Sequence, residues 1–111
     1  MKKTIDFTGT VSHGTMRPQD VLPVLLGILE EYWPEKANKI IEFYSYDWEW
    51  PSADKSLVFP DPLPDYLQDA AMYLWEELAD ALNEIAPETH YFGANIGDGC
   101  DYGFWSIDDI P

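Results

Sequence analysis

Five carboxylate side chains between residues 65 and 84 recur at a spacing that places them on one face of a helix. Successive helical residues are rotated by about 100°, so these five fall within an arc of about 100°, opposite an apolar stripe. They are Asp65, Asp69, Glu76, Asp80 and Glu84. A face of this kind is complementary to the lysine and arginine side chains of a basic protein. The segment itself contains no lysine or arginine.

Two interpretations of this acidic face are open. It is either the solvated face of an acidic protein or a decoy surface for a basic nucleic-acid-binding site. Like-charge pairs four residues apart, such as Glu76 and Asp80, each cost a few tenths of a kcal/mol, whereas a lysine partner would stabilise the helix by about as much. The missing lysines therefore favour the decoy. The imitation is loose, because a step of four residues is about 6 Å and neighbouring phosphates are about 3.4 Å apart.

The charge of the whole chain supports a basic partner. The 111 residues include 21 acidic and 6 basic side chains, which gives a net charge of -15. Residues 56–111 contain twelve of the acids and no lysine or arginine. Such a field repels nucleic acid and anionic membranes and steers basic molecules toward the protein. The expected partner is a basic protein such as a nucleic-acid-binding enzyme or nuclease, with no direct binding of nucleic acid or membrane.

Alternating aromatic residues suggest a second binding surface. If residues 43–50 form a strand, one of its faces carries Tyr44, Tyr46, Trp48 and Trp50. A platform that stacks sugars or bases is disfavoured, because stacking on nucleic acid usually accompanies a basic groove. An inward sheet face or a protein-contact patch fits better. Since tryptophan is favoured at interface hot spots, Trp48 and Trp50 are candidate anchors for a partner.

Neither a metal site nor a catalytic site is expected. Asp98 and Asp101 flank a Gly-Cys pair that faintly suggests a calcium loop, but the twelve-residue ligand series and closing glutamate are missing, so a plain turn is favoured. Both residues instead join the candidate partner-binding surface. No spacing supports a thiol–imidazole pair of Cys100 with His13 or His90, and the chain has no GxSxG, P-loop or GxGxxG motif. We expect a protein that is not an enzyme and needs no cofactor.

The elements that must position these residues follow from periodicity and from the prolines. Alternation predicts a strand over 4–11, and helical spacing predicts a helix from Pro18 that Pro23 kinks or delays. Residues 35–42 fit either a short helix or the lead into the 43–50 strand. The prolines of 51–64 predict a loop, and strands over 90–94 and 102–107 predict a hairpin. The clearest element is a helix over 65–85.

The resulting order, β-α-(β)-α-β-β, predicts an α+β fold in which two main helices pack on one face of a small antiparallel sheet. The length and the absence of a linker predict one domain, residues 1–111. No apolar run is long enough to span a bilayer, and no signal peptide is recognisable. With a single cysteine, these features predict a cytoplasmic protein.

Two stretches carry a resemblance to a known group. The first runs from Gly9 to Asp20, and the second combines residues 91–94, 97–99 and 103–105. Over about a quarter of the chain, they resemble small acidic proteins of unassigned function from bacteria, phages and mobile elements. The resemblance implies an accessory or counter-defence role and transfers no functional residue. The predicted function is an anti-restriction-like or anti-CRISPR-like inhibitor that occludes a basic nucleic-acid-binding site. The alternative is a non-enzymatic immunity-type module that binds one protein through the aromatic face.

Overall fold

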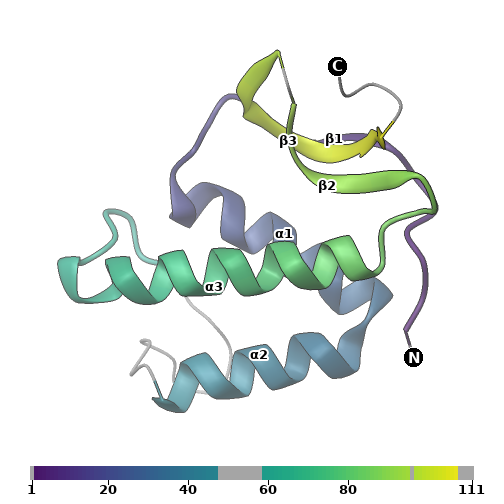
Figure 1. Ribbon diagram of the computed structural model, residues 1–111. Helices are drawn as coiled ribbons and strands as arrows, with labels where there is room; N and C mark the ends of the chain where they lie inside the picture. Colours follow the sequence, from purple (N-terminus) through teal and green to yellow (C-terminus); the bar gives the residue numbers. More distant parts are fainter. Residues whose placement is uncertain (1, 48–58, 96, 108–111) are drawn as a thin grey trace.

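Three helices and a three-stranded antiparallel sheet form the fold in a computed structural model that describes residues 2–47, 59–95 and 97–107 (Figure 1). The α+β class predicted from the sequence is confirmed. In chain order the elements are β1 (Gly9–Ser12), α1 (Pro18–Tyr32), α2 (Pro34–Asp47), α3 (Asp65–Glu84), β2 (His90–Asn95) and β3 (Asp98–Ser106).

The elements are arranged in layers. Helices α1 and α3 pack side by side, with the sheet over one side of the pair and α2 on the other (Figure 1). The strand order is β1-β3-β2, so β3 is central and antiparallel to both neighbours. Phe92 of β2 is paired with Phe104 of β3, and both rings are buried against the helices. The core therefore lies between the sheet and the helix pair and extends to α2.

Prolines set the boundaries of α1 and α2. Pro18 opens α1, where its missing N–H and fixed φ are tolerated. Pro23 lies within the helix, so it neither ends the helix nor delays its start. Trp33 alone separates α1 from α2, which begins at Pro34. The buried face of α1 consists of Val21, Leu22, Leu25, Leu26 and Leu29.

The expected strand over 43–50 is wrong for residues 43–47, which belong to α2. Ala37, Ile40 and Tyr44 are buried at helical spacing (i, i+3, i+7), and this stripe packs on the other helices. The Tyr44 hydroxyl donates a hydrogen bond to Glu77 Oε2 of α3 at 3.1 Å. Burial, together with the nearby Glu77 carboxylate, raises the pKa of Tyr44. Tyr44 and Tyr46 therefore do not lie on a strand face, because both belong to α2. Trp48 and Trp50 lie outside the described residues.

Helix α3 is the element that the sequence predicted best. Its observed bounds, Asp65–Glu84, differ from the expected 65–85 by one residue. Pro64, in an extended conformation, precedes the first turn, and Pro87 follows the end. The buried face is apolar and continuous along the helix. It consists of Leu67, Ala70, Ala71, Leu74, Leu78, Ala81 and Leu82.

The amino-terminal segment corrects the expected strand over 4–11. Strand β1 contains only Gly9–Ser12. Upstream, the Lys3 N–H donates to the Tyr32 carbonyl oxygen (2.7 Å) and the Ile5 N–H donates to that of Ile85 (2.8 Å). The helix ends leave carbonyl groups without intrahelical partners, and these groups pair with residues 3–5 in place of a neighbouring strand. Ile5 is still buried, so the alternation indicated burial correctly but assigned the wrong backbone partner.

The close approach of β1 to β3 requires glycine at position 103. A Cβ atom built on Gly103 would lie 2.1 Å from the carbonyl oxygen of Gly9 and 2.7 Å from its carbonyl carbon. Both contacts involve backbone atoms, which cannot rotate away as a flexible side chain would. Any larger residue must therefore separate the two strands.

Gly103→Ala is expected to lower the free energy of unfolding by about 1–3 kcal/mol, since overpacking at a close contact costs this much. The matched control is Gly99→Ala, in the same strand, where an added Cβ has no atom within 4 Å. Urea unfolding followed by circular dichroism measures both values. Equal stability of the two variants would show that β1 does not approach β3 as described.

Candidate partner-binding surface

The core-facing side of α3 determines where its acidic residues lie. Because the apolar stripe is buried between α1, α2 and the sheet, the opposite face of the helix points to solvent. The structure exposes all five of the acidic residues predicted on this face: Asp65, Asp69, Glu76, Asp80 and Glu84. From first to last they extend over about 28 Å of helix axis, at 1.5 Å per residue.

The two ends of this face have partners within the chain. At the carboxyl end, the Lys2 Nζ lies 3.0 Å from Glu84 Oε1 and 4.6 Å from the centroid of the Trp33 ring. At the amino end, Asp65 Oδ1 accepts a hydrogen bond from Gln68 Nε2 at 3.3 Å. All five carboxylates were expected to lack a basic partner, and the ion pair with Lys2 corrects this expectation for Glu84. Since both side chains of that pair are about half exposed, it is screened by solvent.

The middle of the face is different. Asp69, Glu76 and Asp80 form no ion pair with any residue in the part of the chain that the structure describes. We call these three residues the acidic ridge. Glu76 and Asp80 are four residues apart, so they repel each other across one helical turn. The ridge is therefore a run of exposed carboxylates on α3 with no basic partner among the described residues.

Asp101 lies away from the ridge. Tyr102 and Phe104 face the helices, so Asp101 belongs to the outer face of the sheet, since side chains alternate along a strand. Its Oδ1 accepts a hydrogen bond from Thr10 Oγ1 (2.7 Å), and its Oδ2 accepts one from Asn95 Nδ2 (3.5 Å). Asp101 thus connects β3 to residues of both neighbouring strands, and the structure does not bring it together with the α3 carboxylates.

Three other predicted site residues have no described side chain. Trp48 and Trp50 lie outside the described residues. Asp98 is the first residue of β3, but its side chain is not among those described. Their roles in partner binding stay predictions.

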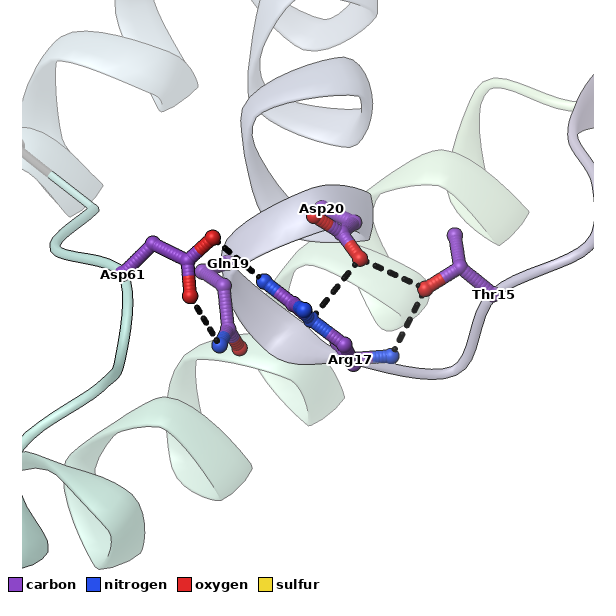
Figure 2. A network of polar contacts seen from close by, with 5 residues as sticks. All are labelled: Thr15, Arg17, Gln19, Asp20 and Asp61. Atoms are coloured by element: carbon purple, nitrogen blue, oxygen red, sulfur yellow. Dashed lines mark hydrogen bonds and ion pairs between the residues drawn. The ribbon is translucent and has the colours of Figure 1, made fainter.

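Arg17, the only arginine of the sequence, forms ion pairs with two aspartates of the same chain (Figure 2). Arg17 Nε lies 3.0 Å from Asp20 Oδ2, and Arg17 Nη2 lies 2.7 Å from Asp61 Oδ2. Thr15 Oγ1 donates to Asp20, and Gln19 Nε2 donates to Asp61. The hydrogen bond from the Arg17 guanidinium lowers the pKa of Asp61. This network ties the start of α1 to the segment that leads into α3.

An apolar pocket opens next to the acidic ridge, and the sequence did not reveal it. Its volume is about 290 Å³. Its walls come from the segment before α1, the first residue of α1, three residues of α3 and one residue of β3. These residues are Met16, Pro18, Met72, Trp75, Glu76 and Tyr102. The sequence signal for it was Met72, an apolar residue that shares the exposed arc of α3 with the acidic residues.

A second hollow of about 400 Å³ continues the pocket, because the two share Pro18 and Met72. The second hollow is lined by Gln19, Pro62, Leu63 and Gln68 as well. Together they form a groove between the start of α1, the first half of α3 and the segment before α3. The Arg17 network holds two sides of this groove at a fixed separation (Figure 2).

Across 2–47, 59–95 and 97–107, no three side chains of His, Cys, Asp or Glu gather as metal ligands. The structure places His13, but not His90, near Cys100, because the N–H of Gly14, the residue after His13, donates to the Cys100 carbonyl oxygen at 3.2 Å. His90 pairs with Ser106 at one end of the hairpin, while Cys100 lies near the other end, so these two do not meet. Within the same ranges, no helix is long and apolar enough to cross a membrane.

No protein-family model, curated protein or solved structure matches the chain. The resemblance to small acidic proteins of bacteria, phages and mobile elements therefore stays a prediction.

Asp61→Asn is expected to lower the melting temperature at neutral pH, because it removes a partner of the Arg17 guanidinium. The folded-state pKa of Asp61 is depressed, so its stabilising effect is present above the unfolded-state pKa of about 4 and is lost as the pH falls through the folded-state value. The melting temperatures of parent and variant should therefore diverge toward neutral pH and converge in acid.

Thermal unfolding followed by circular dichroism at a series of pH values measures this difference. It should be small and sensitive to salt, because the ion pair is exposed. Asp80→Asn is the control: Asp80 has no basic partner among the described residues, so this variant should not lower the melting temperature at neutral pH. A pH-independent difference for Asp61→Asn would contradict the role of its charge.

Proposed function

We propose that the protein is a non-catalytic inhibitor whose acidic helix face occupies the nucleic-acid-binding site of a basic protein. The observation that carries the proposal is the acidic ridge. Asp69, Glu76 and Asp80 are exposed, and no ion pair compensates them within the described chain. They are mounted on a 20-residue helix with no basic residue. The resemblance to small acidic proteins of phages and mobile elements supports a counter-defence role in the cytoplasm.

The energetics favour binding of a cationic surface. Repulsion between Glu76 and Asp80 costs a few tenths of a kcal/mol in the free protein, and lysine or arginine side chains of a partner would relieve it. The helix is held by its buried face, so the backbone that carries the carboxylates needs no ordering when they bind. The net charge of -15 adds long-range attraction, which speeds association at low salt.

The acidic face can cover a site of useful length. From Asp65 to Glu84 it extends over about 28 Å, the axial length of about eight phosphates on one DNA strand. The spacing of carboxylates does not repeat that of phosphates. The proposed mechanism is therefore electrostatic occlusion of a basic groove. The carboxylates do not occupy the individual positions of the phosphates.

The proposal is tested by competition with DNA. The tagged protein is used to capture binding proteins from a nuclease-treated host lysate, and each captured protein is purified and bound to a fluorescent DNA duplex. Titration with the acidic protein should release the duplex, and excess duplex should raise the amount of acidic protein needed. If the captured proteins bind DNA and the acidic protein at the same time, the proposed occlusion is wrong.

The triple variant Asp69→Asn, Glu76→Gln, Asp80→Asn is expected to lose about tenfold or more in affinity for a captured protein at low salt, because the ridge loses all three charges. Its affinity should also depend less on salt concentration. Its fold should persist, since the three side chains are exposed and the substitutions remove a like-charge repulsion. Isothermal titration at a series of salt concentrations measures both effects.

The matched control is the triple variant Glu30→Gln, Glu31→Gln, Glu42→Gln. These residues are also exposed, and the control has the same net charge as the ridge variant. It should bind nearly as well as the parent protein. Equal weakening of both triple variants would mean that total charge alone attracts the partner, and it would remove the ridge from the proposal.

A further inference from the structure

The pocket beside the acidic ridge combines an aromatic wall with two exposed methionines. The rings of Trp75 and Tyr102 meet edge to face, with centroids 5.3 Å apart, and Tyr102 is only 9% exposed. Met16 and Met72, by contrast, are 58% and 60% exposed. The pocket therefore has a fixed inner wall and a flexible thioether rim.

Contact of this apolar surface with water is unfavourable, so a partner that covers it gains binding free energy. Contiguous apolar patches bordered by polar residues mark interaction sites more often than isolated exposed side chains do. The volume of about 290 Å³ is at the lower end of the range for ligand pockets, so it fits one large apolar side chain. Methionine side chains adapt to groups of different shape, which suits a rim that closes on such a side chain.

The charge around the pocket selects its occupant. Glu76 belongs both to the pocket wall and to the acidic ridge. Asp69 lies two turns before Glu76 on the helix, and Asp80 one turn after it. Arg17, the basic residue nearest to Pro18 in sequence, is held by Asp20 and Asp61 and does not compensate Glu76. A group that enters the pocket therefore lies next to a line of uncompensated carboxylates.

We infer that the pocket receives an apolar side chain from a basic amphipathic segment of the partner, with an adjacent lysine or arginine on Glu76 and the rest of the ridge. A second copy of this chain is a poor occupant, because each molecule carries a net charge of -15. The neighbouring hollow, which shares Pro18 and Met72, offers a place for a second side chain of the same segment.

This inference rests on the proposed function, from which it takes the basic character of the partner. It adds that an apolar side chain of the partner anchors the complex in the pocket. The ridge accounts for fast, salt-sensitive association. The pocket accounts for slow dissociation, because a buried apolar anchor contributes in a way that salt does not screen. The parent protein should therefore keep part of its affinity at about 1 M salt, where the Debye length is about 3 Å.

Two synthetic helical peptides of equal charge test the inference. The first carries leucines at i, i+3 and i+4 with lysines at the other positions, and the second has each leucine replaced by alanine. Binding is followed through the ¹³C-labelled methionine methyl groups of the protein. The leucine peptide should shift the Met16 and Met72 signals and should bind about tenfold or more tightly than the alanine peptide at high salt. Equal affinities, or unmoved methyl signals, would overturn the inference.

Variants of the exposed rim separate the pocket from the ridge. The double variant Met16→Gln, Met72→Gln should lose about tenfold in affinity for the leucine peptide and almost nothing for the alanine peptide. Val24→Gln with Ile107→Gln replaces two apolar residues that are exposed elsewhere, and it should leave both affinities unchanged. The ridge variant should bind both peptides more weakly, because both carry the same charge. Failure of the proposed function is measured separately, by the competition with DNA.

Two further results would also overturn the inference. If the methyl signals of Met16 and Met72 change when the protein alone is diluted, a second copy occupies the pocket. If a peptide with the leucines kept and every lysine changed to glutamine binds as tightly as the basic peptide, the pocket does not select a basic segment.

Discussion

Burial of the apolar face of α3 is the constraint on which the other features depend. Leu67, Leu74, Leu78 and Leu82 are fully buried between the sheet and the other two helices, and a full burial of each leucine stabilises the fold by about 1.5–3 kcal/mol. This packing fixes the rotation of the helix about its axis. The carboxylates on the opposite face are then directed to solvent, and Met72, Trp75 and Glu76 are directed to the groove beside α1.

The acidic ridge and the groove are two consequences of one helix position. The ridge lies along the exposed face, and the groove lies where that face meets the start of α1, with Tyr102 of β3 in its wall. Asp61 and Arg17 hold the segment before α3 against α1, so they maintain the width of the groove. Electrostatic attraction and apolar anchoring thus act on neighbouring surfaces, and one basic amphipathic segment can use both.

The parts of the fold with strong local signals could be predicted from the sequence. Helix α3 has a long apolar stripe at helical spacing and is bounded by prolines, and its bounds were predicted to within one residue. The exposure of its acidic residues followed from the same period. Residues 43–47 were wrongly predicted as a strand, because the alternation of aromatic residues was given more weight than helical spacing. The buried side of α2 consists of Ala37, Ile40 and Tyr44, which are spaced as on a helix.

Other features depend on contacts between residues that are distant in the chain, which local sequence patterns indicate only in part. The pocket joins Met16 and Tyr102, which are far apart in the chain, with Trp75 of α3. The ion pair between Lys2 and Glu84 likewise joins residues that are 82 positions apart in the chain. Asn83 was also missed, although its side-chain amide bonds to both the N–H and the carbonyl oxygen of Phe92. In this way it covers part of the outer edge of β2.

Carboxyl footprinting of the complex with a captured basic protein tests the central claim most directly. A carbodiimide and an amine label accessible carboxylates, and mass spectrometry reports the extent of labelling at each position in the free and bound protein. Binding through the acidic ridge predicts strong protection of Asp69, Glu76 and Asp80, while Glu30, Glu31 and Glu42 are labelled as in the free protein. Unchanged labelling of the ridge, with protection on α1 and α2, would contradict the account.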